Sequence, residues 1–109
     1  MKDTAYYLPG MGARFNTGLG RGINDLGYKV VGRETRAEFQ KYSFQDKIDL
    51  VANDLKEHFW YEDAKVVVNS FGAYLFFQAQ LQMKTYPGHV LILSPIIGGS
   101  NDDETMIRF

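Results

Sequence analysis

The chain has 109 residues, a length that fits a single domain, and 45% of them are hydrophobic, enough to form a packed core. Its 12 basic and 13 acidic residues leave a net charge of −1, without the excess of Lys and Arg that nucleic-acid binding requires. The chain has no cysteine, which excludes disulfides, thiolate metal sites and a cysteine nucleophile. No apolar run approaches the roughly 20 residues that span a bilayer. Because the N-terminus also lacks a signal-type segment, we expect a cytoplasmic protein that binds no membrane.

Short apolar runs alternate with longer amphipathic segments along the chain. The pattern predicts strands at residues 5–8, 28–31, 65–68 and 89–93, and helices at about 16–26, 46–59 and 71–83. Residues 33–43 and 94–99 read as loops, and residues 101–109 as a polar tail. Gly18, Gly20 and Gly22 each weaken the first helix by up to ~1 kcal/mol relative to Ala, unless they allow close backbone packing. Gly27 suits a C-terminal cap of that helix.

This alternation of strands and helices predicts the fold class. Strand-helix-strand units imply right-handed crossovers and a parallel sheet. Residues 66–68 and 90–93 are continuously apolar, which is typical of strands that helices cover on both faces. We therefore predict an α/β fold, a three-layer sandwich whose parallel sheet has about four strands in the order 2-1-3-4.

Ser70 stands between an apolar run that ends at Asn69 and the start of a helical stretch. A serine on a sharp turn between strand and helix projects its hydroxyl above the sheet edge. The helix N-terminus behind it can stabilise developing negative charge, so this placement indicates a nucleophile. Taken alone, Ser70 also fits a simple helix cap whose hydroxyl bonds only to the helix backbone.

Together with the glycine-rich loop at residues 10–12 and the order of the elements, this turn makes the whole chain resemble the central part of an α/β-hydrolase. The chain corresponds to that family's third to sixth strands, as a single truncated domain over residues 1–109. The family's nucleophile elbow reads Gly-x-Ser-x-Gly, and residues 68–72 here read Val-Asn-Ser-Phe-Gly. Ser70 takes the nucleophile position, while Val68 replaces the first glycine. That replacement implies a looser turn or a site no longer selected for catalysis.

The resemblance also assigns an oxyanion hole and an activity. The backbone N–H groups of Met11 and Phe71 would be its two donors, each typically worth ~3–4 kcal/mol in the transition state. Pro9 stands where the family often has a histidine, which leaves a main-chain donor unaffected. The implied activity is that of a serine hydrolase acting on a small ester or other acyl substrate, without cofactor or metal.

The partners that a serine nucleophile needs are not evident in residues 1–109. In the family the acid follows the next strand and the histidine lies beyond it. His58 ends a predicted helix, and His89 begins the fourth predicted strand, about 15 Å from Ser70 at the opposite end of the sheet. Asp102, Asp103 and Glu104 follow that strand, but a carboxylate without a histidine makes an incomplete triad. The chain alone would thus be incomplete or inactive, with acid and base supplied beyond Phe109 or by another subunit.

Two other functions stay open. The first is a non-catalytic hydrolase-like fold used for binding or self-association, in which the apolar strand at residues 90–93 pairs with another chain as a homo-oligomer. The second is nucleotide binding at Gly10 and Gly12, with Glu34 placed as a ribose-binding acid. Phe15 stands where that motif has its third glycine, and a tight turn alone explains the other two. No group of His, Asp and Glu has metal-ligand spacing.

Overall fold

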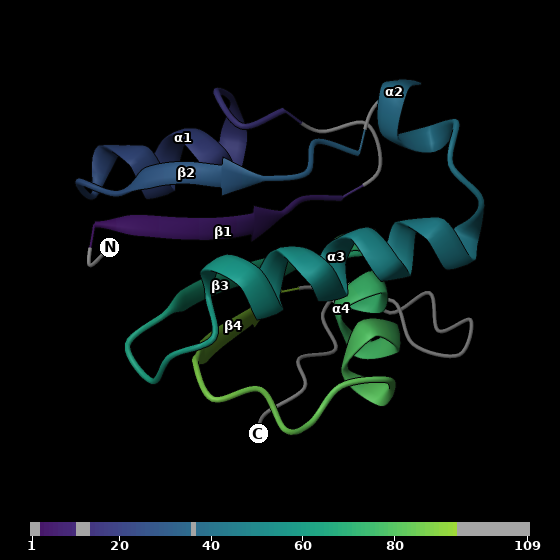
Figure 1. Ribbon diagram of the computed structural model, residues 1–109. Helices are drawn as coiled ribbons and strands as arrows, with labels where there is room; N and C mark the ends of the chain where they lie inside the picture. Colours follow the sequence, from purple (N-terminus) through teal and green to yellow (C-terminus); the bar gives the residue numbers. More distant parts are fainter. Residues whose placement is uncertain (1–2, 11–13, 36, 94–109) are drawn as a thin grey trace.

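The computed structural model describes residues 3–10, 14–35 and 37–93. In chain order the elements are β1 (Thr4–Leu8), α1 (Gly18–Asp25), β2 (Lys29–Gly32), α2 (Ala37–Gln40), α3 (Phe44–His58), β3 (Lys65–Asn69), α4 (Phe71–Leu81) and β4 (His89–Leu93) (Figure 1). The strands form one parallel sheet in the order β2-β1-β3-β4. This arrangement confirms the predicted fold class and strand order.

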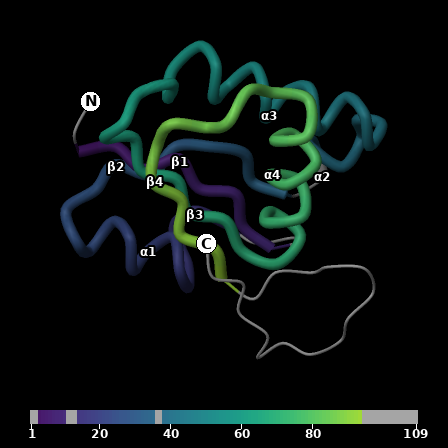
Figure 2. Tube along the Cα trace, turned by 90° about the horizontal axis from the view of Figure 1, so that it is seen from below, coloured from purple at the N-terminus to yellow at the C-terminus, as the bar shows by residue number. Residues whose placement is uncertain are grey.

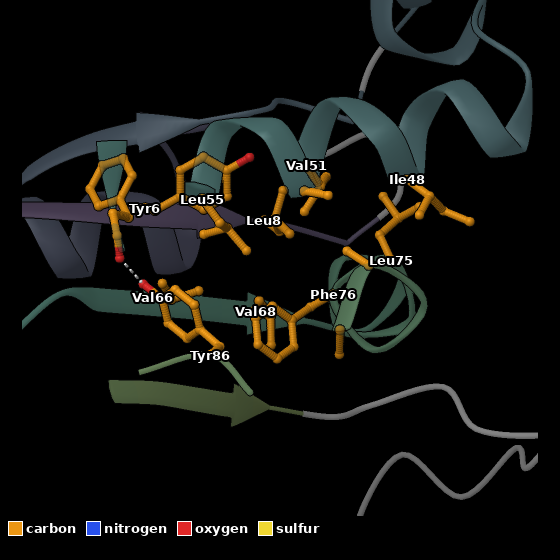
Figure 3. Close-up of a cluster of buried hydrophobic side chains, with 14 of the residues drawn as sticks. Tyr6, Leu8, Ile48, Val51, Leu55, Val66, Val68, Leu75, Phe76 and Tyr86 are labelled. Atoms are coloured by element: carbon orange, nitrogen blue, oxygen red, sulfur yellow. Dashed lines mark hydrogen bonds between the residues drawn. The ribbon is translucent and has the colours of Figure 1, made fainter. Parts of the chain in front are cut away.

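Helices cover both faces of the sheet, which makes the three layers (Figure 2). The larger core lies under α3 and α4 and contains the side chains that Figure 3 labels: Tyr6, Leu8, Ile48, Val51, Leu55, Val66, Val68, Leu75, Phe76 and Tyr86. A smaller core on the other face joins α1 to the sheet through Ala5, Tyr7, Ile23 and Val67. Among the residues that the structure describes, no helix has the length and apolar character needed to traverse a bilayer.

The structure differs from the predicted elements mainly between β2 and α3. The expectation that residues 33–43 form only a loop was wrong, because the short helix α2 lies there. Its single turn is too short to display helical periodicity. Helix α3 begins at Phe44, two residues before the predicted start at 46, because the Ser43 hydroxyl accepts a hydrogen bond from the Asp46 N–H at 3.1 Å and caps the helix.

Of the three glycines in α1, only Gly20 allows close backbone packing, because an added Cβ on Gly18 or Gly22 would meet no atom within 4 Å. An ideal Cβ on Gly20 would fall 2.1 Å from the carbonyl oxygen of Phe15. Gly27, with φ of 101°, follows the helix in a conformation that favours glycine. The segment before α1 is therefore pressed against the helix itself.

A polar network ties β1, the segment after β2 and α3 together. Arg33 donates from Nε and Nη2 to the two carboxylate oxygens of Asp54, at 2.8 and 2.9 Å. The Tyr6 hydroxyl donates to Asp54 Oδ2 at 2.7 Å. Burial, and secondarily the neighbouring Asp54 carboxylate, raise the pKa of Tyr6 well above its ordinary value. The network orients α3 over the sheet.

Candidate active site

Ser70 joins the last residue of β3 to the first residue of α4 in a strained conformation. Its φ of 52° and ψ of −117° make it the one non-glycine residue with positive φ in the described part of the chain. Such a conformation costs of order 1–3 kcal/mol and persists only where the surrounding structure enforces it. Here the Ser70 N–H donates to the Leu93 carbonyl at 3.1 Å, and the Ser70 carbonyl accepts from the N–H groups of Ala73 and Tyr74. The turn is thus sharp although Val68 stands where the Gly-x-Ser-x-Gly motif has its first glycine.

The Ser70 hydroxyl does not cap α4. It makes no side-chain hydrogen bond to the start of that helix, whereas the Ser43 hydroxyl does cap α3. A capping residue also normally has extended φ and ψ, as Ser43 does with φ of −62° and ψ of 162°. A simple cap therefore does not explain the serine at position 70.

The loop after β1 lies directly against Ser70. An ideal Cβ on Gly10 would fall 3.4 Å from Ser70 Cβ and 3.8 Å from Ser70 Oγ. The Gly10 carbonyl in turn accepts a hydrogen bond from the hydroxyl of Thr35, a fully buried residue after β2. Segments that follow three neighbouring strands thus meet at the carboxyl end of the sheet, the edge at which ligands bind in open α/β folds.

Phe71 supplies the one predicted oxyanion donor that the structure describes. As the first residue of α4 it has an N–H group without an intrahelical acceptor, and no other acceptor for this group lies within residues 3–10, 14–35 and 37–93. The helix N-terminus adds a partial positive charge at the same point. The other predicted donor, Met11, lies outside the described residues, as do Asp102, Asp103 and Glu104.

Neither histidine lies near Ser70. His89 pairs with Lys65 and Leu93 pairs with Asn69, so His89 lies at the opposite end of the sheet, as predicted. His58 is the last residue of α3, whose first residue, Phe44, stacks on Tyr74 of α4 with 5.5 Å between ring centroids. The rise of a helix places His58 about 20 Å along α3 from that contact.

Lys47 is a buried cation beside this site that sequence reasoning missed. Its side chain is packed between two aromatic rings, with Nζ 5.8 Å from the ring centroid of Phe71 and 5.9 Å from that of Phe39. Nζ also donates to Gln40 Oε1 at 2.8 Å. These contacts link α2 to the first residue of α4 through α3. A lysine one turn before Val51, on the apolar side of its helix, is the signal that could have identified it.

The residue immediately before Ser70, Asn69, influences the Tyr7 hydroxyl of β1. Burial raises the pKa of Tyr7, and the Asn69 side chain partly offsets that rise.

Glu34, the candidate ribose-binding residue, makes a local hydrogen bond instead. Glu34 Oε2 accepts a hydrogen bond from the Phe15 N–H at 2.8 Å, so this carboxylate holds the loop before α1. That contact does not favour a ribose-binding role for Glu34. Within the part of the chain that the structure describes, no three His, Asp or Glu side chains gather into a metal site.

Comparisons with protein-family models, with curated proteins and with solved structures found no match to this chain. Any function assigned to it therefore rests on the residues and geometry around Ser70.

Proposed function

We propose that this chain carries the nucleophile and oxyanion-hole part of a serine hydrolase of the α/β-hydrolase type, acting on a small ester or other acyl substrate. Ser70 is the nucleophile, and the N–H groups of Phe71 and Met11 are the oxyanion donors. The observation that carries the proposal is the conformation of Ser70, which has positive φ and makes no capping bond. Strain of this kind concentrates at functional sites.

The surroundings of Ser70 support this chemistry. Gly10 has no side chain to block the hydroxyl, and the Phe71 N–H at the start of α4 has no protein acceptor among the described residues. In the reaction, Ser70 Oγ forms a bond to the acyl carbon while its proton passes to a general base. The oxyanion then collapses, the alcohol leaves with a proton, and water hydrolyses the acyl-enzyme. Acid and base come from outside the described residues or from another subunit.

A fluorophosphonate probe tests the proposal, because it reacts with activated serines through the same attack. Because the chain alone lacks a general base for Ser70, we expect labelling of the wild-type chain at Ser70, located by peptide mass spectrometry, when imidazole is present, and loss of this labelling in Ser70→Ala. Ser43→Ala is the matched control, since Ser43 is an exposed capping serine, and this variant should keep full labelling. Imidazole in the buffer supplies a missing base and should accelerate the reaction. A wild-type chain that is not labelled at Ser70 even with imidazole would contradict the proposal.

A non-catalytic binding role is the second candidate, and the distance of both histidines from Ser70 favours it. Unlabelled Ser70 in a folded chain is the outcome that this candidate predicts. Nucleotide binding at the loop of Gly10 and Gly12 predicts a thermal shift with millimolar NAD or ATP. We also propose that the protein is cytoplasmic. Fractionation of cells that express a tagged chain tests this location.

A further inference from the structure

The two edges of the sheet differ in how they resist pairing with another strand. The outer strand β2 has four residues, begins with Lys29 and ends at Gly32, whose φ is 135°. Short length, a lysine and an irregular end are features that discourage edge pairing. The opposite edge strand, β4, has five residues with the sequence His-Val-Leu-Ile-Leu and has none of these features.

The main-chain groups of β4 that face outward can be identified from its bonds to the rest of the sheet. The His89 N–H donates to the Ala64 carbonyl, and the Leu93 carbonyl accepts from the Ser70 N–H. Main-chain groups alternate in direction along a strand. The N–H and C=O groups of His89, Leu91 and Leu93 therefore face β3. The N–H and C=O groups of Val90 and Ile92 therefore face the open edge, without a partner in the described part of the chain.

Apolar surface flanks this open edge on both faces of the sheet. On the α1 face, the side chain of Leu91 is 53% exposed. On the α4 face, a groove of about 420 Å³ borders the strand. It is lined by Phe76, Phe77, Gln80, Thr85, Tyr86, Gly88, Val90 and Ile92. A strand added at this edge would bury apolar surface on both sides while satisfying the outward main-chain groups.

We propose that β4 pairs with β4 of a second copy of this chain, antiparallel about a two-fold axis at Leu91. In this register Val90 lies opposite Ile92 of the second copy, and Ile92 lies opposite Val90 of the second copy. Each of these pairs exchanges two main-chain hydrogen bonds, so the four strands of each copy join into one continuous sheet. The two Leu91 side chains form the closely spaced pair between them.

The chemistry of the edge favours a second copy over another partner, because the surface is complementary to itself. The strand contains no Lys, Arg, Asp or Glu, so two-fold pairing brings no like charges together. His89, its one titratable residue, lies opposite Leu93 of the other copy. Pairing would also restrain Leu93, whose carbonyl holds the strained Ser70 turn. A two-fold contact of this kind closes on itself and gives a dimer.

Sedimentation velocity over a range of concentrations tests this proposal without any need for catalysis. We expect the wild-type chain to form a dimer, and Leu91→Lys to shift it to monomer by placing two ammonium groups opposite each other. Leu26→Lys is the matched control, because Leu26 is 78% exposed but lies at the end of α1, and this variant should stay dimeric. Circular dichroism shows whether each variant is folded.

Val90→Pro provides a second variant, because proline is tolerated in an edge strand where the lost N–H faces outward. This variant should also be monomeric, and the wild-type dimer should protect the Val90 and Ile92 amides from hydrogen exchange. A wild-type chain that is monomeric at every concentration, or a dimer that survives Leu91→Lys, overturns the proposal. A monomer with protected Val90 and Ile92 amides would show that the same chain covers this edge.

Discussion

Gly72 lies against the carbonyl oxygen of Leu8 so closely that an ideal Cβ on Gly72 would fall 2.0 Å from that oxygen. This contact brings the first turn of α4 directly onto the end of β1. It sets the position of the neighbouring Phe71 N–H relative to the loop that begins at Gly10. The contact leaves no room for a side chain at position 72, so this position of the serine turn requires glycine.

Gly72→Ala should be strongly destabilising. The added methyl group meets main-chain atoms that cannot rotate away, so we expect the free energy of unfolding to fall by about 2–3 kcal/mol. Gly22→Ala, in an open position of α1, is the control and should raise that free energy by about 0.5–1 kcal/mol. Urea unfolding followed by circular dichroism measures both. Equal effects of the two substitutions would contradict the close contact.

Ser70→Gly should be more stable than Ser70→Ala by about 1 kcal/mol, because glycine relieves the positive φ that alanine would retain. Ser70→Ala itself should change stability little, since the hydroxyl makes no capping bond. Ser43→Ala should cost about 1 kcal/mol because its hydroxyl does cap α3. Thermal and urea unfolding of the variants measure these differences. Similar stability of the glycine and alanine variants at position 70 would argue against strain in the turn.

Tyr6 should make the protein lose stability at alkaline pH. Its pKa is raised in the folded chain, so its contribution is fully present below the unfolded-state pKa of about 10. Above that pH the unfolded chain releases the proton while the folded chain keeps it, and stability falls by about 1.4 kcal/mol per pH unit for this group. Tyr6→Phe lacks this group. Between pH 10 and 11.5 its free energy of unfolding should therefore fall less steeply than that of the wild type, by up to about 1.4 kcal/mol per pH unit. Parallel curves for the two proteins would show that Tyr6 does not titrate in this way.

The ion pair of Arg33 and Asp54 should contribute more to stability than an exposed pair does. Its side chains are 36% and 20% exposed and its geometry is bidentate, so a double-mutant cycle to alanine should give a coupling energy of about 1–2 kcal/mol. The cycle for Glu38 and Lys41, which are 92% and 71% exposed, should give less than about 0.5 kcal/mol. Unfolding in low salt measures both. Equal coupling in the two cycles would contradict a role for burial.

The strand order and the direction of the strands could be predicted because they follow from local signals. Apolar runs separated by amphipathic segments specify strands and helices, and crossover rules then order the sheet. The same reasoning placed Ser70 after β3 and His89 at the far end of the sheet. Helix α2 escaped prediction because one turn has no periodicity.

The sequence by itself determined an α/β sandwich with a serine between its third strand and the following helix. Only the tertiary structure decided that Ser70 is strained and uncapped, that Gly10 lies against it, and that Lys47 is buried beside Phe71. The physical reason is that these features depend on close contacts between residues far apart in the chain, such as Gly72 with Leu8 and Ser70 with Leu93. Composition and periodicity describe neighbours along the chain, whereas packing determines which of them meet in space.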